Sequence, residues 1–399
     1  MAELYKLDNT VKHYAWGSSS LLPALIGTAN PSGEPWAELW MGVHPGGPSK
    51  TKVQDKIIPL SELTELPFLL KFLAAESPLS IQAHPNITQA QEGFERENRA
   101  GLPAAERNYQ DPNHKPEIVC ALTPFTAMAG FRETTETDRL LSLVNGTEGL
   151  RSFLKEGYRS FLSALFDLNK EERKALTLSI LQTVETVVAA GPAADKNSPA
   201  ALIRLCGEFA KTYPNDPGIL SPLYLNVIEL EPFEGIFIPA GILHAYVRGF
   251  ALECMANSDN VLRGGLTPKH IDLKELFSIL NFEPFKPELL KPVPRSPGCY
   301  SYAPAALCRE FTLYLLKGTK VELTVPEKGI AAVFEGAASV AVAETRTADI
   351  EAAKKQNGGQ KVFLLNRGES AFIGRRQGEE RLIFSGSDTF TLFAALAQE

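Results

Sequence analysis

Residues 68–84 read FLLKFLAAESPLSIQAH, and this stretch indicates the fold class of the chain. Phe68–Leu73 and Leu79–His84 are short apolar runs on either side of a Ser-Pro turn, so both predict β-strands. Glu117–Leu122 is a run of the same kind, and Gly and Pro divide much of the first third of the chain into similar pieces. Many short strands joined by turns predict a β-sandwich or a β-barrel.

The middle of the chain has the pattern of helices instead. An apolar stripe with the spacing i, i+3, i+4, i+7 and i+8 predicts one helix; it consists of Tyr158, Phe161, Leu162, Leu165 and Phe166. Asn169 followed by Glu172 is typical of a helix start, and a second apolar stripe runs from Leu176 to Val188. Ser198 before Pro199 predicts the start of a third helix.

The strand pattern returns after this helical block. Residues 225–230 and 235–238 predict strands, and so do 311–316 and 389–393, whereas 354–359 is polar and predicts a surface loop. We therefore predict a mainly β protein with a helical insertion. We expect a catalytic β domain from 1–131 and 219–291, a helical domain at 132–218 and a C-terminal β domain at 292–399.

The bulk composition limits the partners and the compartment. The 399 residues carry a formal net charge of -7, which disfavours nucleic acid as a partner. The five cysteines are scattered and form no CxxC pair, which argues against a disulfide framework and for a reducing compartment. No apolar run is long enough to span a membrane, and the N-terminus lacks the pattern of a secretory signal. We expect a cytoplasmic monomer without a membrane or nucleic-acid partner.

Three separated segments carry residues that could bind a metal ion. On a strand, side chains two apart share a face, so Gln82 and His84 could face one ion, and Glu117 could face the same site as Lys115. His244 follows the Pro-Ala-Gly of residues 239–241 at the end of a predicted strand. Two imidazoles, one carboxylate and one amide oxygen suit zinc or a similar divalent ion. The alternative for each histidine taken alone is a hydrogen-bonded structural residue of a β core.

The loop after His244 concentrates polar groups. Glu253, Asp259 and Arg263 lie within residues 251–269, a segment with two consecutive glycines that could deliver Asp259 and Arg263 to a pocket beside the metal. The alternative is a surface turn in which Asp259 and Arg263 pair only with each other.

Taken together, these segments resemble the type I phosphomannose isomerases, a family of the cupin superfamily. The matching pieces occur in the order of the family and are YAWGS (14–18), AELWMGVHP (37–45), PLSIQAHPN (78–86), NHKPE (113–117), HAY (244–246) and SDNVLRGGLTPK (258–269). One departure is Phe233, where the resemblance leads us to expect a glycine. The resemblance implies a cupin (jelly-roll) catalytic domain and a C-terminal cupin-like β domain.

The resemblance also implies roles for individual residues. It implies one zinc ion per chain held by Gln82, His84, Glu117 and His244. It further implies a pocket with Lys71 and Ser80 at the substrate phosphate and with the following residues around the sugar: His114, Lys115, Tyr246, Glu253, Asp259 and Arg263. Trp16 and Trp40 we expect to brace the fold.

The implied activity is the interconversion of two sugar phosphates, mannose 6-phosphate and fructose 6-phosphate, by proton transfer through a cis-enediol. The candidates for the proton carrier are Asp259, His114, Glu253 and Lys115, and the sequence does not order them. The alternative function is that of a non-catalytic metal-binding cupin that senses a sugar phosphate. The complete set of ligands and pocket charges favours the enzyme.

Overall fold

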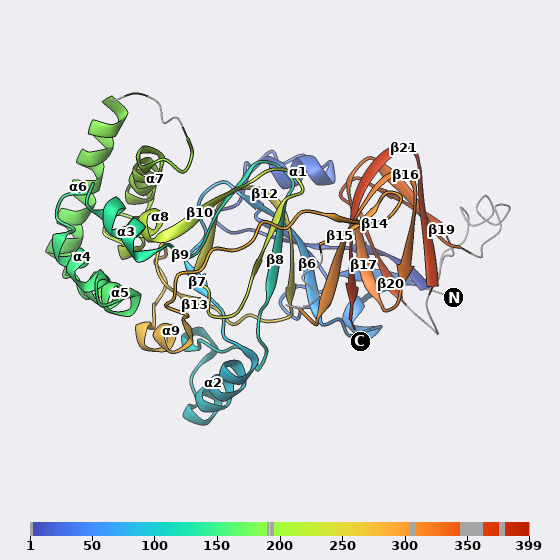
Figure 1. The fold of residues 1–399 in the computed structure, drawn as a ribbon. Coiled ribbons are helices and arrows are strands. Elements are labelled where there is room, and N and C mark those ends of the chain that lie inside the picture. The colour runs from blue at the N-terminus through green and yellow to red at the C-terminus, as the bar shows by residue number, and fades with distance from the viewer. Residues whose placement is uncertain are drawn as a thin grey trace.

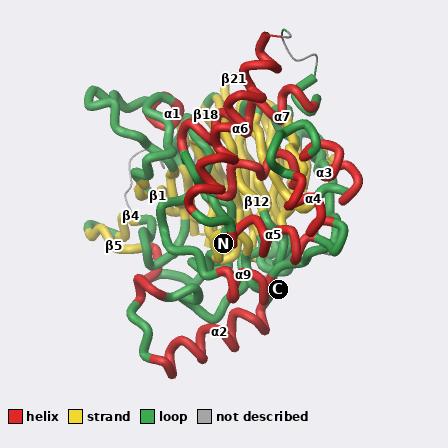
Figure 2. The backbone as a smooth tube through the Cα atoms, turned by 90° about the vertical axis from the view of Figure 1, so that its left-hand side faces the viewer, coloured by secondary structure: helices red, strands yellow, loops and turns green. Residues whose placement is uncertain are grey.

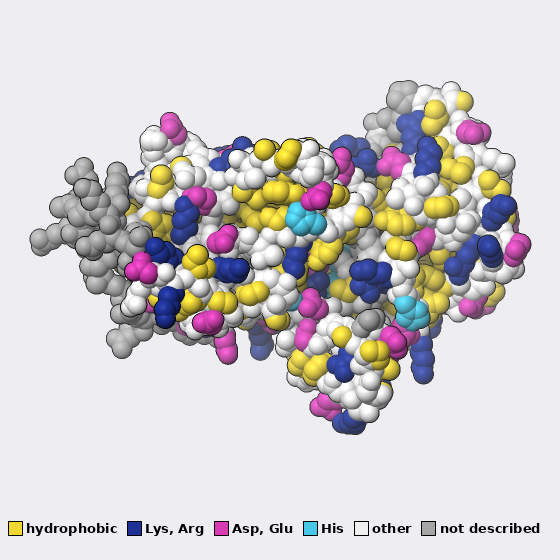
Figure 3. All heavy atoms as spheres, turned by 180° about the vertical axis from the view of Figure 1, so that it is seen from behind, with side chains coloured by type: hydrophobic (Ala, Val, Ile, Leu, Met, Phe, Trp, Pro, Cys, Tyr) yellow, Lys and Arg dark blue, Asp and Glu magenta, His cyan; other side chains and the backbone are white. Residues whose placement is uncertain are grey.

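The computed structural model describes residues 3–189, 191, 195–302, 308–343, 362–374 and 380–398. Figure 1 shows three parts side by side: a group of helices, a first β-sheet in the middle and a second β-sheet around the C-terminal strands. No helix in the described ranges is long and apolar enough to cross a membrane. Lys and Arg are interspersed with Asp and Glu over the face shown in Figure 3.

Three of the four predicted metal ligands lie in the first sheet, and His84 directly follows one of its strands. Within the described residues it has ten strands: β2 (Thr10–Lys12), β3 (Glu38–Met41), β6 (Phe68–Ala75), β7 (Gln82–Ala83), β8 (Glu117–Ala121), β9 (Phe125–Phe131), β10 (Leu225–Leu230), β11 (Gly235–Ile238), β12 (His244–Ala256) and β13 (Leu262–Arg263). The pairs are antiparallel, and the sheet is that of the mainly β, cupin-type domain that the sequence predicts.

β12 is the central strand of this sheet. Its first half pairs with β7 and β9, its second half pairs with β6 and β8, and the register shifts between Tyr246 and Arg248. Gly249 at this bend has φ of 120°, where an added Cβ would lie 2.7 Å from the carbonyl oxygen of Pro124. Because the register shifts between them, Tyr246 and Glu253 of this strand both line one cavity.

β6 shows why an almost continuous apolar run folds as a strand. All eight residues from Phe68 to Ala75 are buried, because both faces of the strand are covered. Lys71 is the only charged residue in this run, and it is 6% exposed. A lysine in such a position needs a counter-charge close by.

The run 79–84, predicted as a strand, enters the sheet only at Gln82 and Ala83. The reason lies in its partners: the Leu79 N–H donates to the Tyr246 carbonyl at 2.9 Å, and the Ile81 N–H donates to the Gly265 carbonyl at 3.0 Å. The segment passes from one neighbouring backbone segment, at Tyr246, to another, at Gly265. It is therefore extended but does not form a long row of hydrogen bonds with a single strand.

The helical insertion agrees with the sequence pattern, except that Val188 at the end of the second predicted stripe is 57% exposed. It contains α3 (Thr134–Leu141), α4 (Glu148–Leu154), α5 (Tyr158–Asp167), α6 (Lys170–Ala189), α7 (Pro199–Thr212) and α8 (Ser221–Tyr224), and the first five lie together over the side of the molecule that faces the viewer in Figure 2. The predicted α5 stripe is buried throughout. Asn169 and Glu172 form the predicted reciprocal cap at 2.8 and 3.0 Å, and the Ser198 side chain accepts from the Ala201 N–H.

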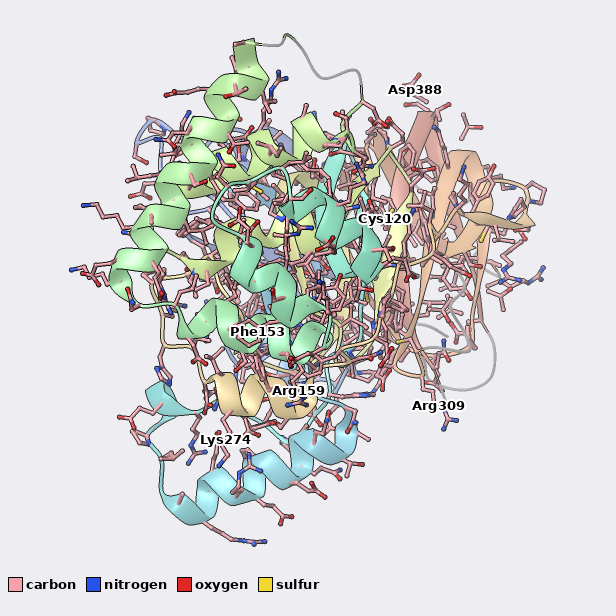
Figure 4. All side chains as sticks on the ribbon, turned by 60° about the vertical axis from the view of Figure 1, so that its left-hand side comes forward. Cys120, Phe153, Arg159, Lys274, Arg309 and Asp388 are labelled. Atoms are coloured by element: carbon pink, nitrogen blue, oxygen red, sulfur yellow. The ribbon has the colours of Figure 1, made fainter. Side chains whose placement is uncertain are left out.

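Three further helices are α1 (Leu21–Ile26), which packs against β6, α9 (Leu273–Ile279), which lies beside β13, and α2 (Ile87–Ala100), whose Arg96 pairs with Glu275 of α9. Arg159 of α5 points toward α9 in Figure 4, where it donates to the Phe277 carbonyl at 3.0 Å and lies 4.4 Å from the Phe282 ring centroid. This contact ties the insertion to the segment that follows the 258–269 loop.

The second sheet has eleven strands among the described residues: β1 (Glu3–Asp8), β4 (Lys50–Val53), β5 (Lys56–Pro59), β14 (Val293–Ser296), β15 (Cys299–Tyr302), β16 (Phe311–Val325), β17 (Gly329–Glu335), β18 (Ala337–Val342), β19 (Val362–Asn366), β20 (Ser370–Gly374) and β21 (Glu380–Ala397). β1 pairs with β20 over five residues, so the N-terminal strand, predicted to be part of the catalytic domain, lies in the C-terminal sheet. It covers the edge of β20, which would otherwise leave backbone groups unpaired. The loop predicted at 354–359 lies outside the described residues.

The two sheets share one apolar core. Phe72, Phe250 and Leu252 of the first sheet belong to the same buried cluster as Phe311 and Phe393 of the second sheet. Cys120, labelled in Figure 4, is buried in this core and contacts Tyr302 at 3.0 Å. The second sheet is therefore packed against the back of the strands that carry the site.

Candidate metal centre and active-site cavity

Three predicted metal ligands converge at the ends of β7, β8 and β12. The candidate ligand atoms of His84, Glu117 and His244 all lie within 4.8 Å of one another, and the three side chains are buried. The Nε2 atoms of His84 and His244 are 3.3 and 3.4 Å from the two Glu117 carboxylate oxygens. Among the described residues, neither Nε2 atom has a hydrogen-bond partner of acceptable geometry.

The backbone determines which ring nitrogen of each histidine faces the centre. The Nδ1 atom of His84 lies 2.7 Å from the Asn260 carbonyl, and the Nδ1 atom of His244 lies 2.9 Å from the Ile242 carbonyl. A carbonyl oxygen can only accept a hydrogen bond, so each Nδ1 carries the proton. In the neutral rings, the Nε2 lone pairs therefore point toward the Glu117 carboxylate. Converging electron-rich atoms of this kind require a cation between them, and the donor set suits zinc.

Electrostatics keeps these ligands in the form that binds a metal. Burial, reinforced by the positive charge of Lys115, lowers the pKa of His84 to about 4. Burial alone would raise the pKa of Glu117, but the positive charge of Lys115 holds it well below its usual range. The Lys115 ammonium lies 3.0 Å from the Glu117 carboxylate. At neutral pH, a neutral imidazole at His84 and a carboxylate at Glu117 thus face the centre.

Gln82 is placed beside this cluster by strand register. It is the cross-strand partner of His244 on one side and of Arg263 on the other. Directly opposite residues of antiparallel strands have Cβ atoms about 5 Å apart, so the Gln82 amide is within reach of the same ion. The strand register is therefore consistent with Gln82 as a fourth, neutral ligand.

The cluster lies at a cavity of about 280 Å³. Its lining includes most of the predicted substrate residues: Lys71, Ser80, Gln82, Lys115, Glu117, Tyr246, Glu253, Asp259 and Arg263. Its lining also includes residues that the sequence did not indicate for substrate: Tyr14, Trp16, Glu38, Trp40, Met255, Thr267 and Lys269. We expected Trp16 and Trp40 to brace the fold, but both also form part of the cavity wall.

Lys71 is held by two carboxylates. Its ammonium lies 3.0 Å from Glu38 and 2.6 Å from Glu253, and Glu38 also accepts from the Trp40 indole at 2.9 Å. Burial alone would lower the pKa of Lys71, but Glu253 and Glu38 raise it above its usual range. The positive charge is thus already matched by negative charge inside the protein. The sequence signal for Glu38 as a partner of Lys71 is that it is an acidic residue within the otherwise apolar run 37–41.

Tyr246 connects the two carboxylates on either side of it. Its hydroxyl lies 3.4 Å from Glu117 and 3.3 Å from Glu253. Burial raises the pKa of Glu253 to about 7, against the opposing effect of Lys71. Glu253 can thus exchange a proton near neutral pH, which is a requirement for a general acid or base.

The 258–269 loop brings further charge to the opening. Asp259 has 53% of its side chain exposed, and its backbone N–H donates to Asp111 at 2.8 Å. Arg263 is half-buried, and burial lowers its pKa. Within the described residues, neither Arg263 nor Lys269 pairs with a carboxylate. The predicted alternative of an Asp259–Arg263 surface pair is therefore not formed.

His114 is the one predicted site residue that neither lines the cavity nor belongs to the metal cluster. Its Nε2 atom lies 2.6 Å from a Glu310 carboxylate oxygen, on the segment that leads into β16. The neighbouring residues 115 and 117 face the cavity, so the alternation of the extended chain turns the side chain of His114 the other way. The sequence could not show this, because Glu310 is 196 residues away.

Comparisons with known proteins agree with this site. The family model described as the catalytic domain of type I phosphomannose isomerase matches residues 4–134. Mannose-6-phosphate isomerase from Escherichia coli (strain K12) is 41% identical over 94% of this chain and 95% of that protein. The enzyme from Bos taurus is 32% identical over 94% of each chain.

Solved structures agree as well. A mutant of phosphomannose isomerase from Salmonella typhimurium matches with a TM-score of 0.83 at 34% identity, covering 100% of both chains. A zinc-bound mannose 6-phosphate isomerase matches with a TM-score of 0.81 at 35% identity, also over 100% of both chains. The extent of these matches shows that the chain belongs to the type I mannose-6-phosphate isomerase family.

Proposed function

We propose that the chain binds one zinc ion through Gln82, His84, Glu117 and His244 and interconverts mannose 6-phosphate and fructose 6-phosphate through a cis-enediol. The observation that carries the proposal is the convergence of His84, Glu117 and His244 at the cavity, with both Nε2 lone pairs directed inward. Zinc bound there would act as a Lewis acid on substrate oxygens.

The protein side chains supply the proton transfer. A carboxylate removes the proton from C2 of the open-chain aldose, the electron pair of that C–H bond forms the C1–C2 double bond, and the π electrons of the C1 carbonyl move onto O1. A proton passes from O2 to O1, and the C2 carbonyl then forms as the carboxylate returns a proton to C1. Asp259 and Glu253 line the cavity as candidate proton carriers, and Glu253 has a pKa of about 7. Arg263 and Lys115 provide positive charge near the developing enediolate.

We place the substrate phosphate at the open end of the cavity. Ser80, Thr267 and Lys269 line it together with Arg263, and no carboxylate in the described part of the chain pairs with either of these two cations. Lys71, which the resemblance implies at the phosphate, is already paired with Glu38 and Glu253. We therefore assign Lys71 to holding Glu253 and assign the phosphate to Lys269 and Ser80, which leaves Arg263 for the enediolate.

Two measurements on the same preparation test the function. Metal analysis of active protein should find about one zinc per chain, and removal by a chelator should abolish isomerisation until zinc is restored. Conversion of mannose 6-phosphate in D2O should place deuterium at C1 of the fructose 6-phosphate, in part if the carboxylate returns the same proton. Activity without metal would refute the zinc assignment, and label at background through many turnovers in both directions would refute the enediol route.

A further inference from the structure

His44 lies behind the cavity wall, between the first β-strands and the 258–269 loop. It is 3% exposed, and its ring packs edge-on against Trp40 with 4.9 Å between ring centroids. It is not among the residues that line the cavity, and it is not one of the proposed metal ligands. Its Nε2 atom nevertheless lies 3.4 Å from the Asp259 carboxylate.

The backbone determines the tautomer of this ring. The Gly46 N–H donates to the His44 Nδ1 atom at 3.1 Å. An amide N–H can only donate, so Nδ1 is the unprotonated nitrogen and the proton of the neutral ring lies on Nε2. Burial lowers the pKa of His44, against the opposing charge of Asp259, so the neutral ring is the stable form. The protonated Nε2 atom is thus the one that lies 3.4 Å from the Asp259 carboxylate, at the distance of an ion-pair contact.

Asp259 needs such a partner to occupy one position. More than half of its side chain is exposed, and its backbone is anchored by the N–H bond to Asp111 at 2.8 Å. That bond leaves the side-chain torsions free, and an exposed carboxylate then samples several rotamers. A buried donor at a fixed place restricts the carboxylate to the rotamer that it can reach.

We propose that His44 is a positioning residue that holds the Asp259 carboxylate at the cavity by donating its Nε2–H. The inference rests on the proposed function, in which Asp259 carries a proton. His44 itself touches neither substrate nor metal in this assignment. Its effect should therefore appear in kcat rather than in the KM for mannose 6-phosphate, and it should depend on the presence of Asp259.

Two substitutions separate the donor from the packing. His44→Leu keeps an apolar side chain against Trp40 but removes the donor, whereas His44→Gln places an amide N–H at about the position of Nε2. We expect His44→Leu to lower kcat about three- to tenfold, the value of one hydrogen bond, with KM changed less than about twofold. His44→Gln should restore most of kcat. Thermal unfolding of each variant checks the fold, and His44→Phe replaces His44→Leu if the latter does not fold.

His13 offers a matched control. Its ring also packs edge-on against a tryptophan, Trp36, with 5.8 Å between centroids, but its Nδ1 atom faces the Pro35 carbonyl at 3.1 Å and the side chain is exposed. His13→Leu should leave kcat unchanged. A loss as large as that of His44→Leu would show that the effect comes from removing any His–Trp contact, and this would overturn the inference.

A double-mutant cycle with Asp259→Asn decides between the remaining outcomes. If His44 acts through Asp259, His44→Leu should cause no further loss of kcat in the Asp259→Asn background. If Asp259→Asn is impaired but the two losses multiply, or if His44→Gln is as impaired as His44→Leu, the role of His44 is refuted while that of Asp259 stands. If Asp259→Asn retains near-normal kcat, the proposed proton-carrier role of Asp259 fails and the inference falls with it.

Discussion

At the residue scale, the pairing of charges decides which side chains are available to a substrate. Lys71 and Lys269 have the same functional group, yet one is buried between Glu38 and Glu253 and the other is exposed at the opening of the cavity. A buried ammonium with two carboxylate partners stabilises those carboxylates and has little net charge to offer. An exposed ammonium without a partner can bind an incoming phosphate.

This difference predicts opposite phenotypes for the two lysines. Lys269→Ala should raise the KM for mannose 6-phosphate about tenfold, the value of one charge-assisted hydrogen bond, and should leave thermal stability unchanged. Lys71→Met should instead destabilise the fold by about 3–5 kcal/mol, because Glu38 and Glu253 would remain buried without a counter-charge.

Steady-state kinetics and thermal unfolding of both variants provide the check. A Lys71→Met protein of normal stability with a strongly raised KM would show that Lys71, and not Lys269, binds the substrate phosphate. An unchanged KM for Lys269→Ala would remove Lys269 from the phosphate site.

At the element scale, the turn between β10 and β11 shows a conflict between a residue and its backbone. Phe233 has φ of 72°, the left-handed region, and it occupies the position where the resemblance led us to expect glycine. The turn is held by the Glu234 N–H, which donates to the Glu231 carbonyl at 2.9 Å, and by the Phe233 N–H, which donates to the Ala121 carbonyl at 2.7 Å. The Phe233 ring has contacts of its own, 5.3 Å from the Lys317 ammonium and 6.4 Å from the Phe393 ring.

A comparison of two small residues isolates the backbone cost at this turn. Phe233→Gly and Phe233→Ala both lose the ring, but only alanine retains a Cβ in the left-handed region. We expect the glycine variant to be more stable than the alanine variant by about 1 kcal/mol. Denaturant unfolding of the two proteins measures this difference. Equal stabilities would mean that the turn relaxes to another conformation when the ring is absent.

At the scale of the whole molecule, the second sheet is connected to the active-site cavity by more than apolar packing. Glu310, which precedes β16, accepts a bond from His114 at 2.6 Å, and His114 directly precedes Lys115. Both partners are partly buried, with 20% of the Glu310 side chain and 31% of the His114 side chain exposed. The bond joins the segment that carries Lys115 and Glu117 to the C-terminal strands.

This bond predicts a pH-dependent contribution to stability. The hydrogen bond from His114 lowers the pKa of Glu310 to about 2, whereas an unfolded glutamate has a pKa of about 4.3. A carboxylate whose folded pKa is lowered stabilises the fold above the unfolded pKa and loses this effect as the pH falls toward the folded value. Glu310→Gln should therefore lower the melting temperature by about 1–2 °C at pH 7, and the deficit should shrink below about pH 4.

Thermal unfolding of the native protein and Glu310→Gln from pH 7 to pH 3 tests this expectation. Arg309→Gln, at the exposed neighbouring position labelled in Figure 4, is the matched control and should show no such pH dependence. A Glu310→Gln deficit that grows as the pH falls from 4 to 3 would contradict the sign of the effect.

The sequence by itself determined the features that depend on local pattern and on the chemistry of a motif. The α5 stripe and the Asn169–Glu172 cap are local because their partners lie within a few residues, and both form as predicted. His84, Glu117 and His244 were identified from ligand type and strand spacing together with the resemblance, and the fold brings them within 4.8 Å.

Only the tertiary structure decided which of the remaining polar residues face the cavity and which are already paired. Lys71 meets Glu38 from 33 residues away, and His114 meets Glu310 from 196 residues away. β1 joins β20 across nearly the whole length of the chain. Such pairings result from the order of the strands in each sheet and from packing between elements. A local pattern of apolar and polar residues encodes neither of these. The type of a residue therefore indicated what chemistry it could supply, and its distant neighbours decided whether it is free to supply it.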